Sequence, residues 1–268
     1  MPSSNGLEME GRVALVAGGS KGIGRATALR LGRMGADVAV AARSEDLGEA
    51  VAEEIRGMGR RAVYLNNDVS VVESAQEMVK RTVDELGRVD ALVVSGAAGG
   101  GQSGVKALPF IDIDPHLYAD YLHSQLITRL NMIGAALPAM REQGYGKIVL
   151  ISSDAGRVPT TSESLFGVAN AGLQFGIKAI AREVARFGVR INAVSITVTK
   201  DTGTWEGYKV GDTPGELLMK VFKRIEEKTP LRLNEPEDVA AAACFFASSA
   251  SDQITGATVS VNGGLCFP

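Results

Sequence analysis

The sequence contains little of what several classes of protein require. Only two of its 268 residues are cysteines and two are histidines, so neither a disulfide framework nor a metal site is expected. Its 28 basic and 31 acidic residues give a formal charge of −3, which does not favour nucleic acid as a partner. The longest apolar segment, Val239 to Ala247, is about half as long as the roughly 20 residues of a membrane span.

The termini and the cysteines predict an ordinary cytoplasmic protein. Residues 1–10 have no basic and apolar signal-peptide pattern, and we expect them to form a flexible tail. Cys244 lies in an apolar helical segment and Cys266 lies near the end, so both are expected to be idle thiols in a reducing compartment. Residues 11–268 contain no repeat or linker, which predicts a single domain.

The clearest positive feature is a regular alternation of short apolar runs with longer amphipathic segments. The apolar runs predict strands, and charged faces at helical spacing predict the helices between them. Strands that alternate with helices form right-handed β-α-β units, so the sequence predicts an α/β fold: a Rossmann-type, doubly wound parallel sheet with helices on both faces. We expect strands at 13–16, 37–42, 62–65, 90–94, 147–151, 189–194 and 258–261, and helices at 25–34, 45–58, 74–86, 117–142, 164–187, 215–227 and 236–248.

A glycine-rich loop follows the first strand, and it has two explanations. Gly18, Gly22 and Gly24 have the spacing G-x-x-x-G-x-G, and a helical pattern begins at Arg25. Glycine allows a tight turn, and it also lets a phosphate approach bare N–H groups at the positive end of a helix. On this motif alone, a strand-to-helix turn and a nucleotide site are equally good interpretations.

Further motifs follow at separations typical of one family. Asp68-Val69 comes after the third strand, and the strand within Gly146–Ser153 ends in a serine pair. With the glycine loop, these motifs make the chain resemble the short-chain dehydrogenase/reductase family over nearly its whole length. The resemblance implies a nicotinamide dinucleotide cofactor and oxidoreductase chemistry. The C-terminal motifs that also match are Pro230-Leu231, 235–240, Thr255-Gly256 and 262–264, with Ala17 and Asn262 replacing the usual threonine and aspartate.

The residues at two diagnostic positions favour NADP(H) over NAD(H). An acidic side chain at the end of the second strand would bind a ribose 2′-hydroxyl and repel a 2′-phosphate. This sequence has Ala42 there, followed by Arg43, and Lys21 lies inside the glycine loop. Two cations without a carboxylate suit a 2′-phosphate. The cofactor-binding residues that the resemblance implies are Gly18, Ser20, Lys21, Gly22, Ile23, Gly24, Arg43, Asp68, Val69 and Gly96.

Most of the family's catalytic residues are absent. The family uses an Asn-Ser-Tyr-Lys set, in which tyrosine exchanges a proton with the substrate oxygen and the lysine ammonium lowers the pKa of that tyrosine. Counting from Ser153, the tyrosine position holds Phe166 and the lysine position holds Asn170. The asparagine position falls on Gln125. Only Ser153 remains, so the chain is identified as a divergent member with a degenerate catalytic tetrad.

The losses are confined to the half of the site that would face the nicotinamide. The family's Asn-Asn-Ala-Gly after strand four is replaced by Val94-Ser95-Gly96-Ala97, and its Pro-Gly after strand six by Ile196-Thr197. The adenine and phosphate motifs are present. We therefore expect that nucleotide binding, or at least the structural role of the glycine loop, stayed useful after ordinary catalysis was lost.

Other side chains that can exchange protons are present, but the sequence places none of them beside a nicotinamide. Packing or surface roles are the simpler explanation for each. The candidates are His116, Tyr118, Tyr121, His123, Asp154, and Trp205 and Tyr208 in a lid expected at about 199–230.

Small residues in the segment 164–187 favour an oligomer. Small residues recur there at near-helical spacing, which allows another helix to approach closely: Gly167, Ala169, Ala171, Gly172 and Gly176. In the family, this helix and the preceding long helix form a dimer interface, and the last strand forms a second interface. We expect a dimer or tetramer, either of identical chains or with other subunits of the same family.

Three hypotheses about function remain. The first is a non-catalytic or weakly catalytic subunit that partners an active dehydrogenase paralogue, on a hydroxyacyl- or ketoacyl-CoA-type substrate. The second is an atypical NADP(H)-dependent oxidoreductase of carbonyl compounds or secondary alcohols with a relocated acid–base residue, or a non-redox enzyme that reuses the pocket. The third is a binding module in which NADP(H) occupancy changes the affinity for a partner. The loop 98–114 and the lid match no substrate signature.

Overall fold

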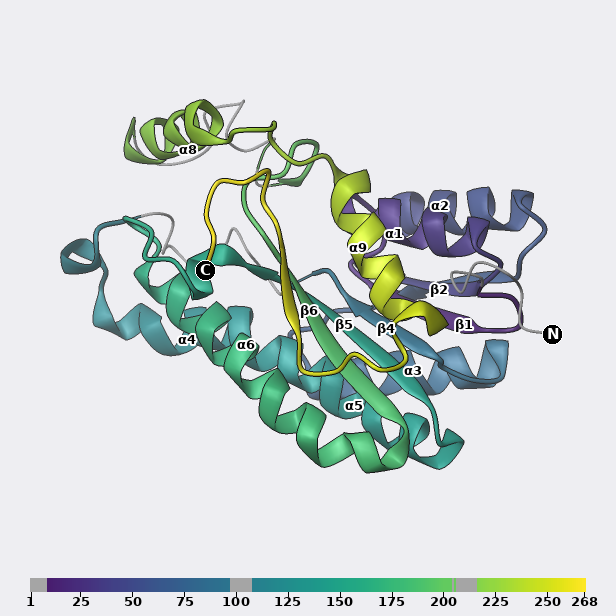
Figure 1. Cartoon of the computed structure of the whole chain (residues 1–268). Coiled ribbons are helices and arrows are strands. Elements are labelled where there is room, and N and C mark those ends of the chain that lie inside the picture. Colours follow the sequence, from purple (N-terminus) through teal and green to yellow (C-terminus); the bar gives the residue numbers. More distant parts are fainter. Residues whose placement is uncertain (1–8, 97–107, 204, 206–215) are drawn as a thin grey trace.

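The centre of the molecule is a seven-stranded sheet with the strand order β3-β2-β1-β4-β5-β6-β7 (Figure 1). The computed structural model of the chain describes residues 9–96, 108–203, 205 and 216–268. Each neighbouring pair of strands is parallel, as the alternation of strands and helices predicts. The strands are β1 (Val13–Ala17), β2 (Asp37–Ala42), β3 (Ala62–Asn66), β4 (Ala91–Val94), β5 (Gly146–Ser153), β6 (Val189–Ile196) and β7 (Thr258–Val261).

Helices cover both faces of this sheet. The described helices are α1 (Gly22–Arg33), α2 (Glu45–Gly57), α3 (Val72–Leu86), α4 (Tyr118–Leu122), α5 (Thr128–Gln143), α6 (Ser164–Val184), α8 (Glu216–Lys228) and α9 (Pro236–Ala247), of which α8 lies away from the sheet (Figure 1). Ala14 and Val16 of β1 face α1, α2 and α9, whereas Leu15 faces α3, α5 and α6 (Figure 1). The central strands β1 and β4 are fully buried and apolar, whereas β5, β6 and β7 also carry polar side chains.

The loops considered as a site lie at one edge of the sheet. The strand order reverses at β1, which pairs with β2 on one side and with β4 on the other. In open parallel sheets, ligands bind outside the carboxyl ends of the strands at such a reversal. The glycine loop follows β1, Gly96 follows β4 and Ser153 ends β5, so all three lie at this edge.

The long helix expected at 117–142 is present and ends at Gln143, but it contains a π turn that the sequence does not predict. It is divided into a 3₁₀ turn at Pro115–Leu117, then α4, a π turn at His123–Ile127, and α5. A π turn inserts an extra residue into the helical repeat. Gln125 lies in the middle of the π turn and is buried. The segment 164–187 also differs slightly, because α6 ends at Val184 and a 3₁₀ turn follows.

The remaining predicted strands and helices are confirmed, with ends that shift by a few residues. The largest shift among them is that of α1, which begins at Gly22 although its apolar pattern begins near Arg25. Most of the expected tail, much of the loop 98–114 and part of the lid, including Tyr208, lie outside the described residues.

Candidate functional site

Two glycines of the loop are required by the packing of the backbone itself. A Cβ on Gly18, which has φ +83°, would lie 2.8 Å from the backbone N of Gly96. A Cβ on Gly24 would lie 2.0 Å from the carbonyl O of Gly18. No side chain fits at such distances. These contacts hold the turn between β1 and α1 against the end of β4, whether or not a ligand is present.

The N-terminal end of α1 is chemically suited to an anion. Its first turn contains no acidic residue, and no side chain among the described residues caps its N–H groups. The aligned peptide dipoles place partial positive charge at this end. Lys21 and Arg43 are exposed, and neither side chain forms an ion pair or hydrogen bond with another described residue. A 2′-phosphate and a pyrophosphate fit this donor set.

On the adenine side, Asp68 and Val69 follow β3 as the sequence predicts. Asp68 Oδ1 accepts a hydrogen bond of 3.0 Å from the backbone N of Ser70. That bond, the hydroxyl of Ser70 and the charge of Arg43 hold the pKa of Asp68 below its ordinary value. Val69 is half-buried against the core under α3 and α5. The carboxylate of Asp68 is therefore held in place and anionic, and it is available to accept hydrogen bonds from a base.

Residues of the lid approach Gly22, the middle glycine of the loop. A Cβ on Gly22 would lie 3.2 Å from the carbonyl O of Asp201 and 3.3 Å from Cγ2 of Thr202. Gly22 has φ +49°, and Asp201 has a positive φ of 52° although it is not a glycine. The space beside the middle glycine is therefore occupied by the chain's own backbone and by the side chain of Thr202.

The residues at the family's serine and lysine positions are in direct contact. Ser153 ends β5, and its backbone N donates a hydrogen bond of 3.1 Å to Oδ1 of Asn170 on α6. The same oxygen accepts from Oγ of Ser152 at 3.0 Å. Nδ2 of Asn170 donates to the carbonyl O of Phe166 at 2.9 Å. Asn170 is fully buried, and its amide joins the end of β5 to the first half of α6.

Behind Asn170 lies Arg129, which the sequence analysis did not single out. Arg129 is 8% exposed, and its Nη1 donates to Oδ1 of Asn170 at 3.3 Å. Its Nε has no hydrogen-bond partner among the described residues. Burial lowers the pKa of Arg129 to about 10. A buried cation without a carboxylate is costly, so the polar atoms of Asn170 matter for its retention. In the sequence, Arg129 could be placed near the site only because it lies four residues, about one helical turn, after Gln125.

Phe166 and Tyr121 belong to a small apolar cluster on the outer side of this contact. Ile113, Tyr121 and Leu165 are its buried members, and Phe166 packs against them. Burial, reinforced by Glu163, raises the pKa of Tyr121 to about 12, although Arg129 opposes this. A phenol with such a pKa is not prepared to exchange protons near neutral pH.

Glu163 is a second residue that the sequence analysis did not single out. It is the N-cap residue of α6, three positions before Phe166, and it is half-buried. Burial raises the pKa of its carboxyl group to about 7. A carboxylic acid with a pKa near the operating pH has the property that acid–base catalysis requires.

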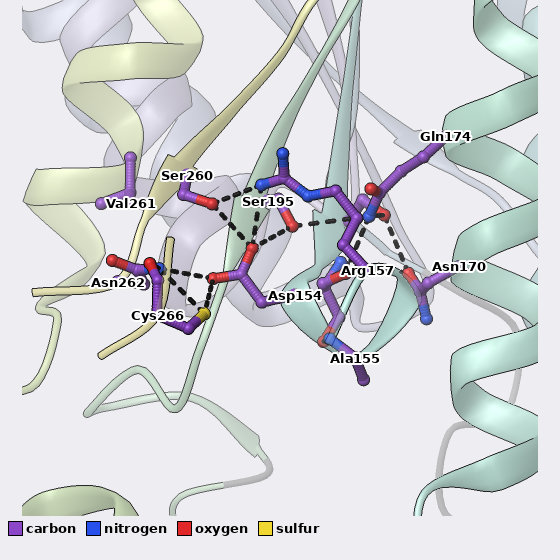
Figure 2. Close-up of polar contacts among 12 residues, drawn as sticks. Asp154, Ala155, Arg157, Asn170, Gln174, Ser195, Ser260, Val261, Asn262 and Cys266 are labelled. Carbon is purple, nitrogen blue, oxygen red and sulfur yellow. Dashed lines mark hydrogen bonds and ion pairs between the residues drawn. The ribbon is translucent and has the colours of Figure 1, made fainter. Parts of the chain in front are cut away.

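Asp154, weighed from the sequence as a replacement acid, is the centre of a structural network instead (Figure 2). Its Oδ1 accepts from Oγ of Ser195 at 2.7 Å and from Oγ of Ser260 at 2.8 Å. Its Oδ2 accepts from Nδ2 of Asn262 at 2.7 Å. Arg157 forms an ion pair with it at 3.1 Å and donates to Ser260 as well. One carboxylate thus joins β5, β6, β7 and the C-terminal segment.

Gln174 connects the Asp154 network to the Asn170 contact. Its Nε2 donates to the carbonyl O of Ser153 at 2.7 Å and to Oγ of Ser152 at 2.8 Å. The polar side chains from α6 and the three last strands therefore lie in one continuous cluster, drawn in Figure 2. Burial alone would raise the pKa of Asp154, but its hydrogen bonds outweigh burial and hold that pKa below its ordinary value.

None of the described helices is both long enough and apolar enough to cross a membrane. Within the same part of the chain, no group of three or more histidine, cysteine or acidic side chains is arranged to hold a metal ion.

We expect Asp154→Asn to lower the free energy of unfolding by about 2–4 kcal/mol at pH 7, because an amide NH₂ would face the NH₂ of Asn262. The lowered pKa means that the carboxylate contributes stability above the unfolded-state pKa and loses it as the pH falls through the folded-state pKa. The difference between variant and wild type should therefore shrink below about pH 4. Urea unfolding at pH 7 and pH 3 measures it, with the exposed Asp84→Asn as control. An equal difference at both pH values would contradict the assignment.

The comparisons with known proteins agree with this geometry. A family model described as enoyl-(acyl carrier protein) reductase matches residues 17–266. A cyclohexanol dehydrogenase from Rhodococcus sp. is 32% identical over 280 residues, which covers 98% of this chain and 99% of the relative. A 3-oxoacyl-(acyl-carrier-protein) reductase from Staphylococcus epidermidis is 32% identical over 254 residues, which covers 94% of this chain and 98% of the relative.

The fold is shared as well as the sequence. The crystal structure of a short-chain type dehydrogenase/reductase from Mycobacterium marinum has a TM-score of 0.82 and 27% identity, with 98% of each chain covered. Sequence and structure thus match over nearly the full length of the chain. The chain belongs to the short-chain dehydrogenase/reductase family, whose members bind a nicotinamide dinucleotide.

Proposed function

We propose that this chain is a non-catalytic or weakly catalytic subunit of an oxidoreductase system. It binds NADP(H), and it assembles with an active dehydrogenase of the same family. The observation that carries the proposal is the position of Asn170. At the place where the family has its lysine, the side chain is fully buried, and its oxygen accepts hydrogen bonds from three donors of the surrounding structure.

The chemistry of this contact explains why ordinary catalysis is unfavourable. A lysine ammonium donates hydrogen bonds but cannot accept any. In its place here is an acceptor, with the guanidinium of Arg129 beside it. The neighbouring Phe166 has no proton to exchange and packs in an apolar cluster. General acid–base assistance is worth about 10²–10⁴ in rate, so its loss alone makes turnover slow.

Exposed apolar side chains on α6 support assembly with another subunit. Phe175 is 75% exposed and Val168 is 55% exposed, one on each side of the small residues Ala171 and Gly172 on the same surface of the helix. Ile127, at the end of the π turn, is 39% exposed. A flat, small-residue surface flanked by large apolar side chains is suited to close packing against another helix.

The names of the relatives support a substrate class for the assembled enzyme. One relative acts on a 3-oxoacyl group carried by a protein, and another on cyclohexanol, a secondary alcohol. A hydroxyacyl- or ketoacyl-thioester of the CoA type shares features with both substrates. It contains an acyl group, and the carbon that is oxidised or reduced is that of a secondary alcohol. Lys21 and Arg43 are the residues that would favour the 2′-phosphate of NADP(H).

The assembly is tested by purifying the full chain alone and after co-expression with a dehydrogenase encoded next to it. We expect a mixed dimer or tetramer by size-exclusion chromatography, and NADP⁺- or NADPH-dependent turnover of a hydroxyacyl- or ketoacyl-CoA only in the mixed sample. The lone chain should turn over at least 10²-fold more slowly than the mixture. A lone homo-oligomer with full activity would overturn the proposal.

We expect Asn170→Lys to lower the free energy of unfolding by about 3–5 kcal/mol, because it buries a second cation beside Arg129 and leaves three donors without an acceptor. Adding Arg129→Leu should recover part of that loss, since the repulsion is then removed. Thermal unfolding of both variants measures this.

The pair Phe166→Tyr with Asn170→Lys should not restore NADPH-dependent turnover of carbonyl compounds. A stable Asn170→Lys protein with restored turnover would show that the lysine position had stayed functional.

Glu163 favours a second candidate function, an atypical NADP(H)-dependent oxidoreductase with a relocated acid. Its carboxyl group lies one helical turn before Phe166, and burial raises its pKa to about 7. In this case the lone chain would reduce carbonyl compounds, and its activity would depend on both Glu163 and Ser153. Loss of turnover in Glu163→Gln, with NADPH binding unchanged, would favour this candidate over the first.

The pH dependence of stability tests the environment of Glu163 without any substrate. A folded-state pKa raised to about 7 means that the contribution of the protonated acid is full below pH 4.5 and is lost as the pH rises through 7. We therefore expect Glu163→Gln to gain stability relative to wild type between pH 5 and pH 8, by about 2 kcal/mol or more. The exposed Glu183→Gln on the same helix is the control. Parallel pH profiles for wild type and Glu163→Gln would contradict the burial of the charge.

A further inference from the structure

Residues 199–203, which begin the lid, are tied to the body of the protein rather than projecting from it. Thr199 forms a bridge with Asn234, and the backbone N of Lys200 donates to the carbonyl O of Asn234 at 2.9 Å. Asn234 is itself buried, and its Nδ2 donates to the carbonyl O of Val261 in β7 at 2.6 Å. We call residues 199–203 the strap.

Hydrogen bonds of Thr202 hold the strap in a compact turn. Its Oγ1 donates to the carbonyl O of Thr199 at 2.8 Å, and it accepts from the backbone N of Trp205 at 3.3 Å. Trp205, the one tryptophan of the chain, is 8% exposed. The strap is therefore anchored at one end by Asn234 and at the other by a buried indole.

The turn places the strap directly on the glycine loop. A Cβ on Gly22 would lie 3.2 Å from Asp201 O, 3.3 Å from Thr202 Cγ2 and 3.5 Å from Thr202 Cα. The space beside Gly22 is thus already tight for a single carbon atom, since carbon atoms in contact lie about 3.5–4.0 Å apart. A phosphate group is larger than a methyl group and does not fit there while the strap stays in this position.

The strap also brings a charge and a strained residue to the same place. Asp201 has φ +52°, a conformation that a non-glycine residue rarely adopts, and its side chain is exposed. Backbone strain of this kind is found at switch segments. Asp201 is the residue whose carbonyl O lies beside Gly22, and its negative charge opposes a pyrophosphate, which is also negative.

We propose that the strap is an autoinhibitory segment that covers the pyrophosphate position of the glycine loop, and that a dinucleotide displaces it in order to bind. This inference rests on the proposed binding of NADP(H) and adds its regulation. The apparent dissociation constant of a ligand increases by the inverse of the fraction of molecules that are open. A strap that is open in about one molecule in ten weakens dinucleotide binding about tenfold. Adenosine 2′-monophosphate, which has no pyrophosphate, is not affected.

The position of Trp205 provides the first test, made on the full chain. Because the indole is buried at the end of the strap, displacement exposes it to water, and we expect NADP⁺ to shift its fluorescence emission to longer wavelength. Adenosine 2′-monophosphate, titrated as a matched ligand, should bind without this shift. NADP⁺ binding without a shift in the emission wavelength would contradict the proposal that the strap is displaced.

Two variants and a control separate the strap from the rest of the site. Thr202→Gly removes the methyl group over Gly22 and both hydrogen bonds of the turn, and should tighten NADP⁺ binding about tenfold while leaving adenosine 2′-monophosphate within twofold. Asp201→Asn should tighten NADP⁺ binding about twofold to threefold at low salt, and the gain should vanish in 1 M salt. Arg43→Ala, the control, should weaken both ligands equally.

The outcomes distinguish the strap from the nucleotide proposal. If wild type and Thr202→Gly bind NADP⁺ with equal affinity and adenosine 2′-monophosphate binds normally, the proposal that the strap is autoinhibitory is wrong. The proposal that the chain binds a nucleotide then still stands. Failure of both ligands to bind any variant overturns nucleotide binding, and the strap with it. NADP⁺ binding that appears only in Thr202→Gly supports the strap in its strongest form. Isothermal titration measures all of these affinities.

Discussion

The side-chain oxygen of Asn170 is the contact on which the centre of the molecule depends. It accepts from Arg129 on α5, from Ser152 in β5 and from the backbone of Ser153, and so joins three elements at one atom. In a buried place each of these donors would otherwise be unsatisfied, at a cost of about 1–3 kcal/mol apiece. The position therefore requires an acceptor. A lysine ammonium could not meet this requirement, because it donates hydrogen bonds but accepts none.

The fold could be predicted from the sequence because its signal is repeated in every unit. Apolar strands that alternate with helices with one charged side leave few alternatives to a doubly wound parallel sheet, and right-handed connections further limit its topology. The π turn at His123–Ile127 could not be predicted, because an extra residue in a helix leaves the apolar pattern on each side unchanged. That turn carries Gln125 and lies between Tyr121 and Arg129, so a local irregularity decides what surrounds the site.

The site could be predicted only in part, since sequence spacing gives neighbours but not burial. Counting from Ser153 places Asn170 beside it, and the two are in contact, but the loss of the catalytic lysine at Asn170 stays a prediction. Arg129 and Glu163 look like surface charges on amphipathic helices, and only the packing shows them buried or half-buried. Asp154 is the reverse case. Its position after Ser153 suggests an acid, whereas three of the donors that surround it, Ser195, Ser260 and Asn262, lie more than 40 residues away in the sequence.

The residues of the glycine loop have different roles, and only some of them bear on whether a ligand binds. Gly18 and Gly24 are required by backbone contacts within the protein, so their presence says nothing about a ligand. The groups that favour a nucleotide are instead the uncapped N–H groups of α1 and the cations of Lys21 and Arg43, which form no hydrogen bond or ion pair with another described residue. Gly22 belongs to neither class, because its open side is filled by the strap. An anion that competes with the strap would use those N–H groups and cations.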